Sequence, residues 1–114
     1  MNSISSTQAL SIANELYLIS GEVQPLPGDE DANFKITTEN GAKYILKISV
    51  ENQEEDALQF QNELLEFLNT KNLSFLVPQI IRNKDGKHIS ETIINNNQLY
   101  VRTVTFIELS LINN

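Results

Sequence analysis

An asparagine–glycine pair constrains this chain more than any other feature, because Asn40 and Gly41 lie between two strand-like runs. Asn-Gly is the strongest short-range signal for a two-residue hairpin turn, since both turn positions need a positive φ. The flanking runs, 33–38 and 42–49, are rich in β-branched and aromatic residues, which favour strands. The sequence therefore predicts an antiparallel β-hairpin with these two residues as its turn.

A two-residue turn also predicts the register of this hairpin. Phe34 would face Lys47, and Ile36 would face Ile45 two residues nearer the turn. Because successive side chains alternate between the faces of a sheet, these four would share one side. The other side would carry the apolar residues that alternate with them: Tyr44, Leu46 and Ile48. Both faces are then largely apolar, so each of them needs a covering layer.

Two helices are predicted, and each of them could cover one face of the sheet. Residues 7–19 have apolar side chains at helical spacing, after a capping-box pattern that begins at Ser5. Gly21 is expected to end this helix. Residues 54–70 carry a second apolar stripe, which contains one polar residue, Gln61. A polar side chain at such a position needs a hydrogen-bond partner.

Further extended segments complete the pattern. Residues 22–27 contain two prolines and are predicted to form an edge strand or the start of a loop. Three later strands are predicted, at 76–81, 88–94 and 98–107. The length of 114 residues suits one small domain. A helix before three strands, and a second helix before the remaining strands, predict an α+β fold.

The charge and residue usage exclude several classes of function. Eight Lys and Arg against 15 Asp and Glu give a net charge of −7, which disfavours binding to nucleic acid or to an anionic membrane. The absence of cysteine excludes disulfides and thiolate metal sites, and a single histidine excludes a multi-histidine zinc site. That histidine, His88, is predicted to be a surface residue. Because neither a signal peptide nor a membrane-spanning run is found, the predicted location is the cytoplasm.

Lys47 is the residue that most suggests a binding site. It lies in the run Tyr44-Ile45-Leu46-Lys47-Ile48, between apolar residues that a sheet would bury. In one interpretation it is an edge lysine whose amine reaches water past its apolar neighbours. In the other it is a cation on the inner face of the sheet, which needs a polar or anionic partner. Gln61 or a bound phosphate could be that partner.

Several segments together resemble the N-terminal lobe of the aminoglycoside phosphotransferase and choline kinase-like family, which has the protein-kinase fold. They follow the order of the family over residues 9–108, and they are Leu16-Tyr17, 20–34, 44–49, 59–65 and Val77-Pro78. The first of them looks closest to the branch of hydroxylysine-kinase-like proteins and of kinase domains joined to class III aminotransferases. The resemblance implies an antiparallel sheet of about five strands, with an N-terminal helix and a helix between strands three and four.

The resemblance also implies which residues would bind the phosphates of ATP. Lys47 matches the lysine that holds the α- and β-phosphates, and Gln61 lies where the family has a glutamate that orients this lysine. Residues 28–34 match the loop that covers the phosphates, although this loop has one glycine and three acidic residues. The loop positions implied in nucleotide binding are Gly28, Asp31, Asn33 and Phe34. Without the resemblance, the same loop is an ordinary solvated acidic turn.

The resemblance places the adenine at the hinge between two lobes. Residues 104–108 match this hinge, and the implied positions are Val104, Thr105 and Ile107. The adenine pocket would be lined by Val23, Ile36 and Ile45. The alternative for these apolar residues is the ordinary hydrophobic core, since pocket lining and core differ little in sequence.

The catalytic aspartate of the family and its magnesium-binding aspartate belong to a C-terminal lobe, whereas this chain ends just past the segment matched to the hinge, at about 104–109. We therefore expect residues 1–114 to form the ATP-binding lobe of a longer small-molecule phosphotransferase, inactive by itself and using Mg²⁺ only with the second lobe. The γ-phosphate would pass to a hydroxyl of an amino alcohol or an aminoglycoside-like substrate. The alternative is a non-catalytic α+β module, or degenerate kinase lobe, used for protein contacts or regulation.

The implied partners are a nucleotide and the C-terminal lobe of the same protein. A lobe without its counterpart exposes an apolar face, and such faces tend to associate. We therefore also expect a homodimer through the strand Leu99–Phe106 and the hinge, which a light-scattering mass of one chain at high concentration would contradict.

Overall fold

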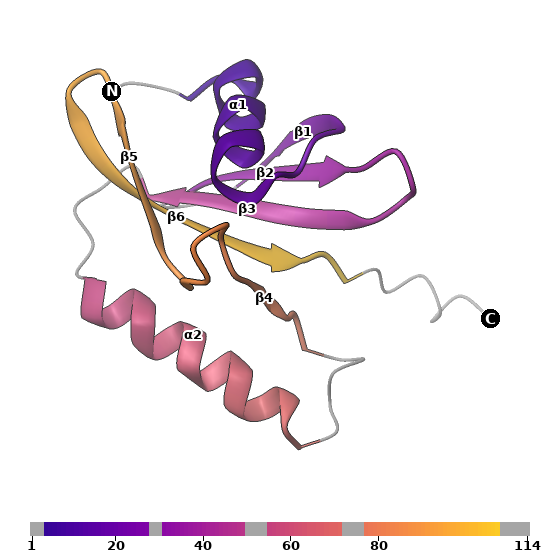
Figure 1. Ribbon diagram of the computed structural model, residues 1–114, viewed down its shortest axis with the longest axis vertical. Helices are drawn as coiled ribbons and strands as arrows, with labels where there is room; N and C mark the ends of the chain where they lie inside the picture. Colours follow the sequence, from indigo (N-terminus) through magenta and orange to yellow (C-terminus); the bar gives the residue numbers. More distant parts are fainter. Residues whose placement is uncertain (1–3, 28–30, 50–54, 72–76, 108–114) are drawn as a thin grey trace.

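The computed structural model describes residues 4–27, 31–49, 55–71 and 77–107. Its elements are α1 (Ser6–Tyr17), β1 (Glu22–Leu26), β2 (Asp31–Thr37), β3 (Lys43–Ser49), α2 (Glu55–Asn69), β4 (Ile80–Ile81), β5 (Ser90–Ile94) and β6 (Asn97–Thr105). The strands form one six-stranded sheet in the order β1-β2-β3-β6-β4, and β5 also pairs with β6. All of these pairs are antiparallel. The two helices lie on opposite sides of the sheet (Figure 1). The predicted α+β fold is confirmed.

Helix α1 begins as the sequence predicts and ends earlier. The N–H of Gln8 donates to Ser5 Oγ at 3.1 Å, and the N–H of Ser5 donates to Gln8 Oε1 at 2.9 Å. This capping box supplies partners for amides that the first turn of the helix leaves unpaired. The helix ends at Tyr17 because Leu18 adopts the left-handed conformation, with φ 59°. Gly21 therefore lies beyond the end of α1 and does not terminate it.

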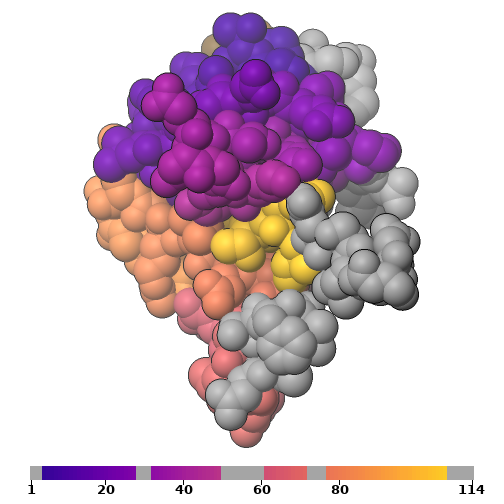
Figure 2. All heavy atoms as spheres, turned by 90° about the vertical axis from the view of Figure 1, so that its right-hand side faces the viewer, coloured from indigo at the N-terminus to yellow at the C-terminus, as the bar shows by residue number. Residues whose placement is uncertain are grey.

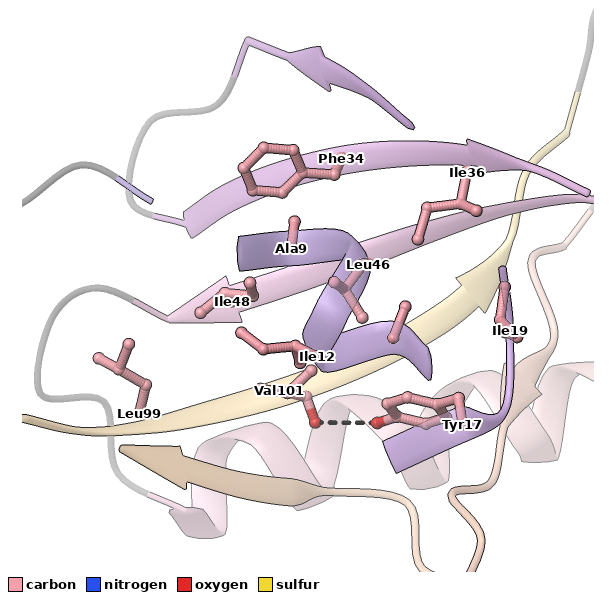
Figure 3. Close-up of a cluster of buried hydrophobic side chains, with 11 residues drawn as sticks. Ala9, Ile12, Tyr17, Ile19, Phe34, Ile36, Leu46, Ile48, Leu99 and Val101 are labelled. Atoms are coloured by element: carbon pink, nitrogen blue, oxygen red, sulfur yellow. Dashed lines mark hydrogen bonds between the residues drawn. The ribbon is translucent and has the colours of Figure 1, made fainter. Parts of the chain in front are cut away.

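The main hydrophobic core lies between α1 and the sheet. Figure 3 shows the side chains of α1 and of the central strands pointing into one cluster. Its buried members are Ala9, Ile12, Ala13, Tyr17, Ile19, Phe34, Ile36, Leu46, Ile48, Leu99 and Val101. Because this cluster draws on β2, β3 and β6 as well as α1, it fixes which face of each strand is turned away from α1.

The predicted register of the β2–β3 hairpin is wrong by one residue. Thr38 pairs with Ala42 around a turn of residues 39–41, since the N–H of Thr38 donates to the carbonyl oxygen of Ala42 at 2.8 Å. Thr38 Oγ1 also accepts from the Ala42 N–H at 3.0 Å, which stabilises this longer turn. Phe34 consequently lies opposite Leu46, and Asn33 lies opposite Lys47.

The corrected register reverses the faces that the sequence predicted for β2. Phe34 is 3% exposed and Ile36 is 1% exposed, and both belong to the core beneath α1. With the predicted two-residue turn, Phe34 and Ile36 would have lain on the face opposite Leu46 and Ile48. Burial of two large side chains outweighs the local preference of Asn-Gly, because each is worth about 1.5–3 kcal/mol.

A buried polar network crosses this core. The hydroxyl of Tyr17 donates to the carbonyl oxygen of Val101 at 3.1 Å, and Ser90 Oγ donates to the same hydroxyl at 3.1 Å. Asn83 Nδ2 in turn donates to Ser90 Oγ at 2.9 Å. The network joins α1 to β6 and to the start of β5. Burial raises the pKa of the Tyr17 hydroxyl above its usual 10.0.

This shift of the Tyr17 pKa predicts a dependence of stability on pH. Because folding favours the protonated hydroxyl, its contribution is complete below about pH 10 and is lost as the pH rises through the raised pKa. We expect Tyr17→Phe to lower the free energy of unfolding by about 1 kcal/mol at neutral pH. The variant should also lose less stability than the wild type above about pH 10.

Urea unfolding at about pH 8 and pH 11 tests this expectation. Tyr100→Phe is the matched control, because it removes the same hydroxyl from a half-buried tyrosine of β6. Equal losses of stability in the wild type and in Tyr17→Phe would contradict the expectation.

Neither described helix is long and apolar enough to cross a membrane. Within the described ranges, no group of His, Asp and Glu is arranged to hold a metal ion.

Candidate functional site

The face of the sheet opposite α1 carries two cations side by side at its centre. Lys47 in β3 lies directly opposite Arg102 in β6, and Ile45 lies opposite Val104. Paired residues share a face, and alternation along β3 separates this set from Leu46 and the core. The interpretation of Lys47 as an inner-face cation is therefore supported, because β3 lies between β2 and β6 and is not an edge strand.

A pocket of about 300 Å³ lies between this face and α2. Its lining residues are Lys47, Gln61, Leu64, Leu65, Pro78, Arg102 and Val104. The C-terminal end of β6, in yellow, reaches the surface beneath the β2–β3 hairpin in Figure 2. The structure thus brings together Lys47, Gln61 and Val104, three of the residues that the sequence proposed for one site.

Lys47 has a hydrogen bond to the strand that follows the proposed phosphate loop. Its Nζ donates to Asn33 Oδ1 at 3.4 Å, across the β2–β3 pair. Asn33 and Lys47 are therefore adjacent, as a shared nucleotide site requires. Asp31 forms the first residue of β2, opposite Ser49, and Gly28 lies outside the described residues.

Helix α2 differs from its predicted orientation by one residue. The buried polar side chain on this helix is Asn62, which is 0% exposed, whereas Gln61 is exposed at the mouth of the pocket. One residue corresponds to about 100° of rotation around a helix. Leu64 and Phe67 are also more exposed than the predicted stripe requires, at 47% and 56%. The apolar stripe is wide enough in sequence to allow either orientation, and contacts with the sheet decide between them.

Asn62 and Arg102 form a contact that the sequence reasoning missed. Arg102 Nη1 donates to Asn62 Oδ1 at 3.2 Å, and Arg102 is only 7% exposed. This hydrogen bond joins β6 to α2 across the inner face. The available signal was a charged residue within an apolar strand, the same signal that identified Lys47.

His88 is also misplaced by the sequence analysis. Its side chain is 9% exposed, and its Nε2 lies 2.9 Å from Glu66 Oε2. Arg82 reaches the same carboxylate oxygen at 3.3 Å. These contacts connect α2 to the segment between β4 and β5. The expectation of a surface histidine is wrong because Glu66, far away in sequence, covers it.

Three apolar candidates lie away from this pocket. Phe34 and Ile36 belong to the core beneath α1, and Val23 packs against that core. The predicted place of Phe34 and Ile36 on the face of Lys47 is wrong, and the cause is the register of the β2–β3 hairpin. Ile45 keeps its predicted place on the inner face, opposite Val104.

The segment matched to the hinge continues directly from β6. The N–H of Thr105 donates to the carbonyl oxygen of Gln79 at 2.9 Å, and Thr105 Oγ1 accepts from the Gln79 N–H at 2.9 Å. The backbone N–H of Thr105 is therefore already bonded to Gln79, the residue before β4. Ile107 follows β6 and is half-buried.

The strand Leu99–Phe106, proposed as a dimer surface, lies inside the sheet. It pairs with β3 along one edge and with β4 and β5 along the other. Val101, Arg102, Thr103 and Val104 are all less than 9% exposed. Residues 101–104 therefore offer little open surface for the predicted self-association, which stays a prediction.

No protein-family model and no curated protein matches the chain. Among the solved structures that match the chain, two each cover 90% of it. One is amicoumacin kinase hAmiN in complex with AMP-PNP, Ca2+ and Ami, at 20% identity and a TM-score of 0.75. The other is a microcompartment-associated aminopropanol kinase, at 17% identity and a TM-score of 0.74. The chain spans 31% and 32% of the length of these two proteins.

Both neighbours are small-molecule kinases, and identities this low relate folds and not activities. The described elements match the expected order of an N-terminal helix, three strands, a second helix and the remaining strands. The chain has an α+β, kinase N-lobe-like fold.

Proposed function

We propose that residues 1–114 form the ATP-binding lobe of a small-molecule phosphotransferase. The observation that carries this proposal is the position of Lys47, on the inner face of a kinase N-lobe-like sheet and in a pocket beneath α2. A lysine at this place can hold the phosphates of a nucleotide. ATP would supply the phosphoryl group, and the lobe would bind and orient it.

The residues present suit a bound nucleotide. Lys47 and Arg102 supply positive charge, which stabilises phosphate oxygens. Asn33 lies beside Lys47, where it can orient the amine. Ile45 and Val104 supply apolar surface on the same face, and Val104 leads into the segment proposed as the hinge. The carbonyl oxygen of Thr105 and the backbone of Ile107 are our candidates for the adenine edge, because the N–H of Thr105 is bonded to Gln79.

We propose an amino alcohol or an aminoglycoside-like molecule as the acceptor of the phosphoryl group. Support comes from the sequence resemblance, which is closest to the hydroxylysine-kinase-like branch, and from the fold shared with an aminopropanol kinase. The catalytic aspartate, the magnesium ligands and the acceptor site would belong to a C-terminal lobe of the same protein. The described residues of this chain would then contribute binding and not the base.

One observation favours a second candidate, a degenerate lobe that serves protein contacts. A neutral amide, Gln61, stands where the family resemblance expects the glutamate that pairs with the lysine. Asn62 contacts Arg102 and not Lys47 in the hydrogen bond that joins α2 to the sheet. Measured nucleotide binding decides between the two candidates, since only the first requires it.

Lys47→Met tests the proposed function. We expect this change to lower the affinity of the chain for AMP-PNP about tenfold or more, because a charge-assisted contact to phosphate is lost. Stability should change little, since methionine keeps the apolar part of the side chain. Titration of the purified chain, followed by NMR chemical shifts, measures even weak binding.

Lys84→Met is the matched control for this experiment. Lys84 lies in the exposed turn between β4 and β5 and does not line the pocket, so the change removes the same charge outside the proposed site. AMP-PNP affinity should stay at the wild-type value in this variant. Equal affinities in the wild type and in Lys47→Met would count against the nucleotide site, and would favour the non-catalytic candidate.

A further inference from the structure

We propose that Arg102 is a second phosphate-binding cation of this pocket and that Asn62 positions it. The inference rests on the proposed nucleotide site and adds a ligand preference to it. With two cations, the pocket should favour nucleotides that carry two or more linked phosphates over a nucleoside or a monophosphate.

The two cations are paired across neighbouring strands. Lys47 and Arg102 are direct partners in the β3–β6 register, and both line the same pocket. Directly opposite residues in an antiparallel pair have Cβ atoms about 4.5–5.5 Å apart, and like charges at this spacing repel. An anion bound between them is attracted by both charges at once. A chain of two or more phosphates carries more negative charge than one phosphate, so it gains more from two neighbouring cations.

Arg102 is largely buried and is held by a side chain of α2. The side chain is 7% exposed, and its Nη1 donates to Asn62 Oδ1 at 3.2 Å. Asn62 is an uncharged partner, so this bond orients the guanidinium and adds no negative charge of its own. A guanidinium has five N–H donors in a planar fork that matches the oxygens of a phosphate.

The amide nitrogen of Asn62 also points to a ligand on the inner face. Its Nδ2 is buried and has no hydrogen-bond partner among the described residues. Buried donors are satisfied in most proteins, and an exception calls for an acceptor such as a ligand or an ordered water. An anion held by Arg102 brings acceptor oxygens to the same part of the inner face.

The test measures the affinities of adenosine, AMP, ADP and AMP-PNP for the purified chain by NMR titration. The wild type should bind ADP and AMP-PNP more tightly than AMP. The informative variant is the double substitution Asn62→Leu with Arg102→Met, which removes both partners of the hydrogen bond between α2 and β6. It should stay folded, bind adenosine like the wild type, and bind ADP and AMP-PNP about tenfold more weakly.

Arg102→Lys is the conservative variant. It keeps the charge and loses the planar fork, so it should recover part of the affinity for AMP-PNP that the double variant loses. A role confined to holding α2 against the sheet predicts a different pattern, in which adenosine and AMP-PNP lose affinity equally. Such an equal loss would overturn the inference.

Two further outcomes distinguish a failure of this inference from a failure of the proposed function. If the double variant binds AMP-PNP like the wild type while Lys47→Met does not, Arg102 holds no phosphate and the proposed function stands. If wild-type chain binds none of the four compounds, the proposed function fails and the inference fails with it.

Discussion

Alanine at position 21 is expected to destabilise this fold by about 3 kcal/mol or more, because a side chain has no room there. Gly21 has φ 157°, and a Cβ atom would lie 2.1 Å from the carbonyl oxygen and 2.8 Å from the carbonyl carbon of Thr37. The Cα of Thr38 would be 2.9 Å away. These are backbone atoms at the end of β2, which pairs with β1 and β3. Relief of the overlap therefore requires the sheet or the link from α1 to move.

Gly41→Ala and Gly86→Ala are the matched controls for this prediction. Both glycines have positive φ, at 92° and 79°, and a Cβ at either would meet nothing within 4 Å. Each control should cost about 1–2 kcal/mol, the price of an alanine in this conformation. Urea unfolding of the three variants separates the conformational cost from the overlap. If Gly21→Ala costs no more than the controls, the close approach of Thr37 is not the constraint.

The elements that the sequence predicted well are those specified by local patterns. The capping box at Ser5, the helical spacing after it and the order of strands and helices all come from residues close together in the chain. Lys47 was found in the same way, because a charged residue within an apolar strand is unusual at any register. Such signals do not depend on knowing which distant segment packs against which.

The register of the β2–β3 hairpin depends on long-range packing, and the sequence analysis predicted it wrongly. Asn-Gly favoured a two-residue turn at 40–41, yet the pair lies within a longer turn. The tight turn with two positive φ values occurs instead at Asn95 and Asn96, which join β5 to β6. In the first hairpin, burial of Phe34 and Ile36 beneath α1 decides the register. A local turn preference of about 1 kcal/mol or less cannot compete with two such side chains.

The candidate site was only partly predictable for the same reason. Lys47 and Ile45 share one face, as predicted, because the alternation of side chains along a strand does not depend on which strand it pairs with. Asn62 and Arg102 were missed because their contact joins residues 40 positions apart. His88 and Glu66 are separated by 22 positions, and neither residue carries a local sign of the other.

Ile48→Ala is the second large effect that we expect. Ile48 is 0% exposed in the central strand β3, opposite Val101 of β6 and within the core beneath α1. Truncation to alanine removes buried apolar surface and leaves a cavity, at a cost of about 3 kcal/mol, within the range of about 2–5 seen for such changes. A small domain has only about 5–15 kcal/mol of stability in total. The variant should therefore unfold at a clearly lower urea concentration.

Ile93→Ala isolates burial as the cause of that loss. Ile93 also lies in a strand, β5, but it is 71% exposed, so the same substitution should change stability by about 0.5 kcal/mol or less. Both changes remove a β-branched residue from a strand, and the difference between them measures packing beneath α1. Equal losses in the two variants would contradict the placement of Ile48 in the core. Because Ile48 and Lys47 are consecutive in β3 and face opposite sides, that result would also remove Lys47 from the inner face.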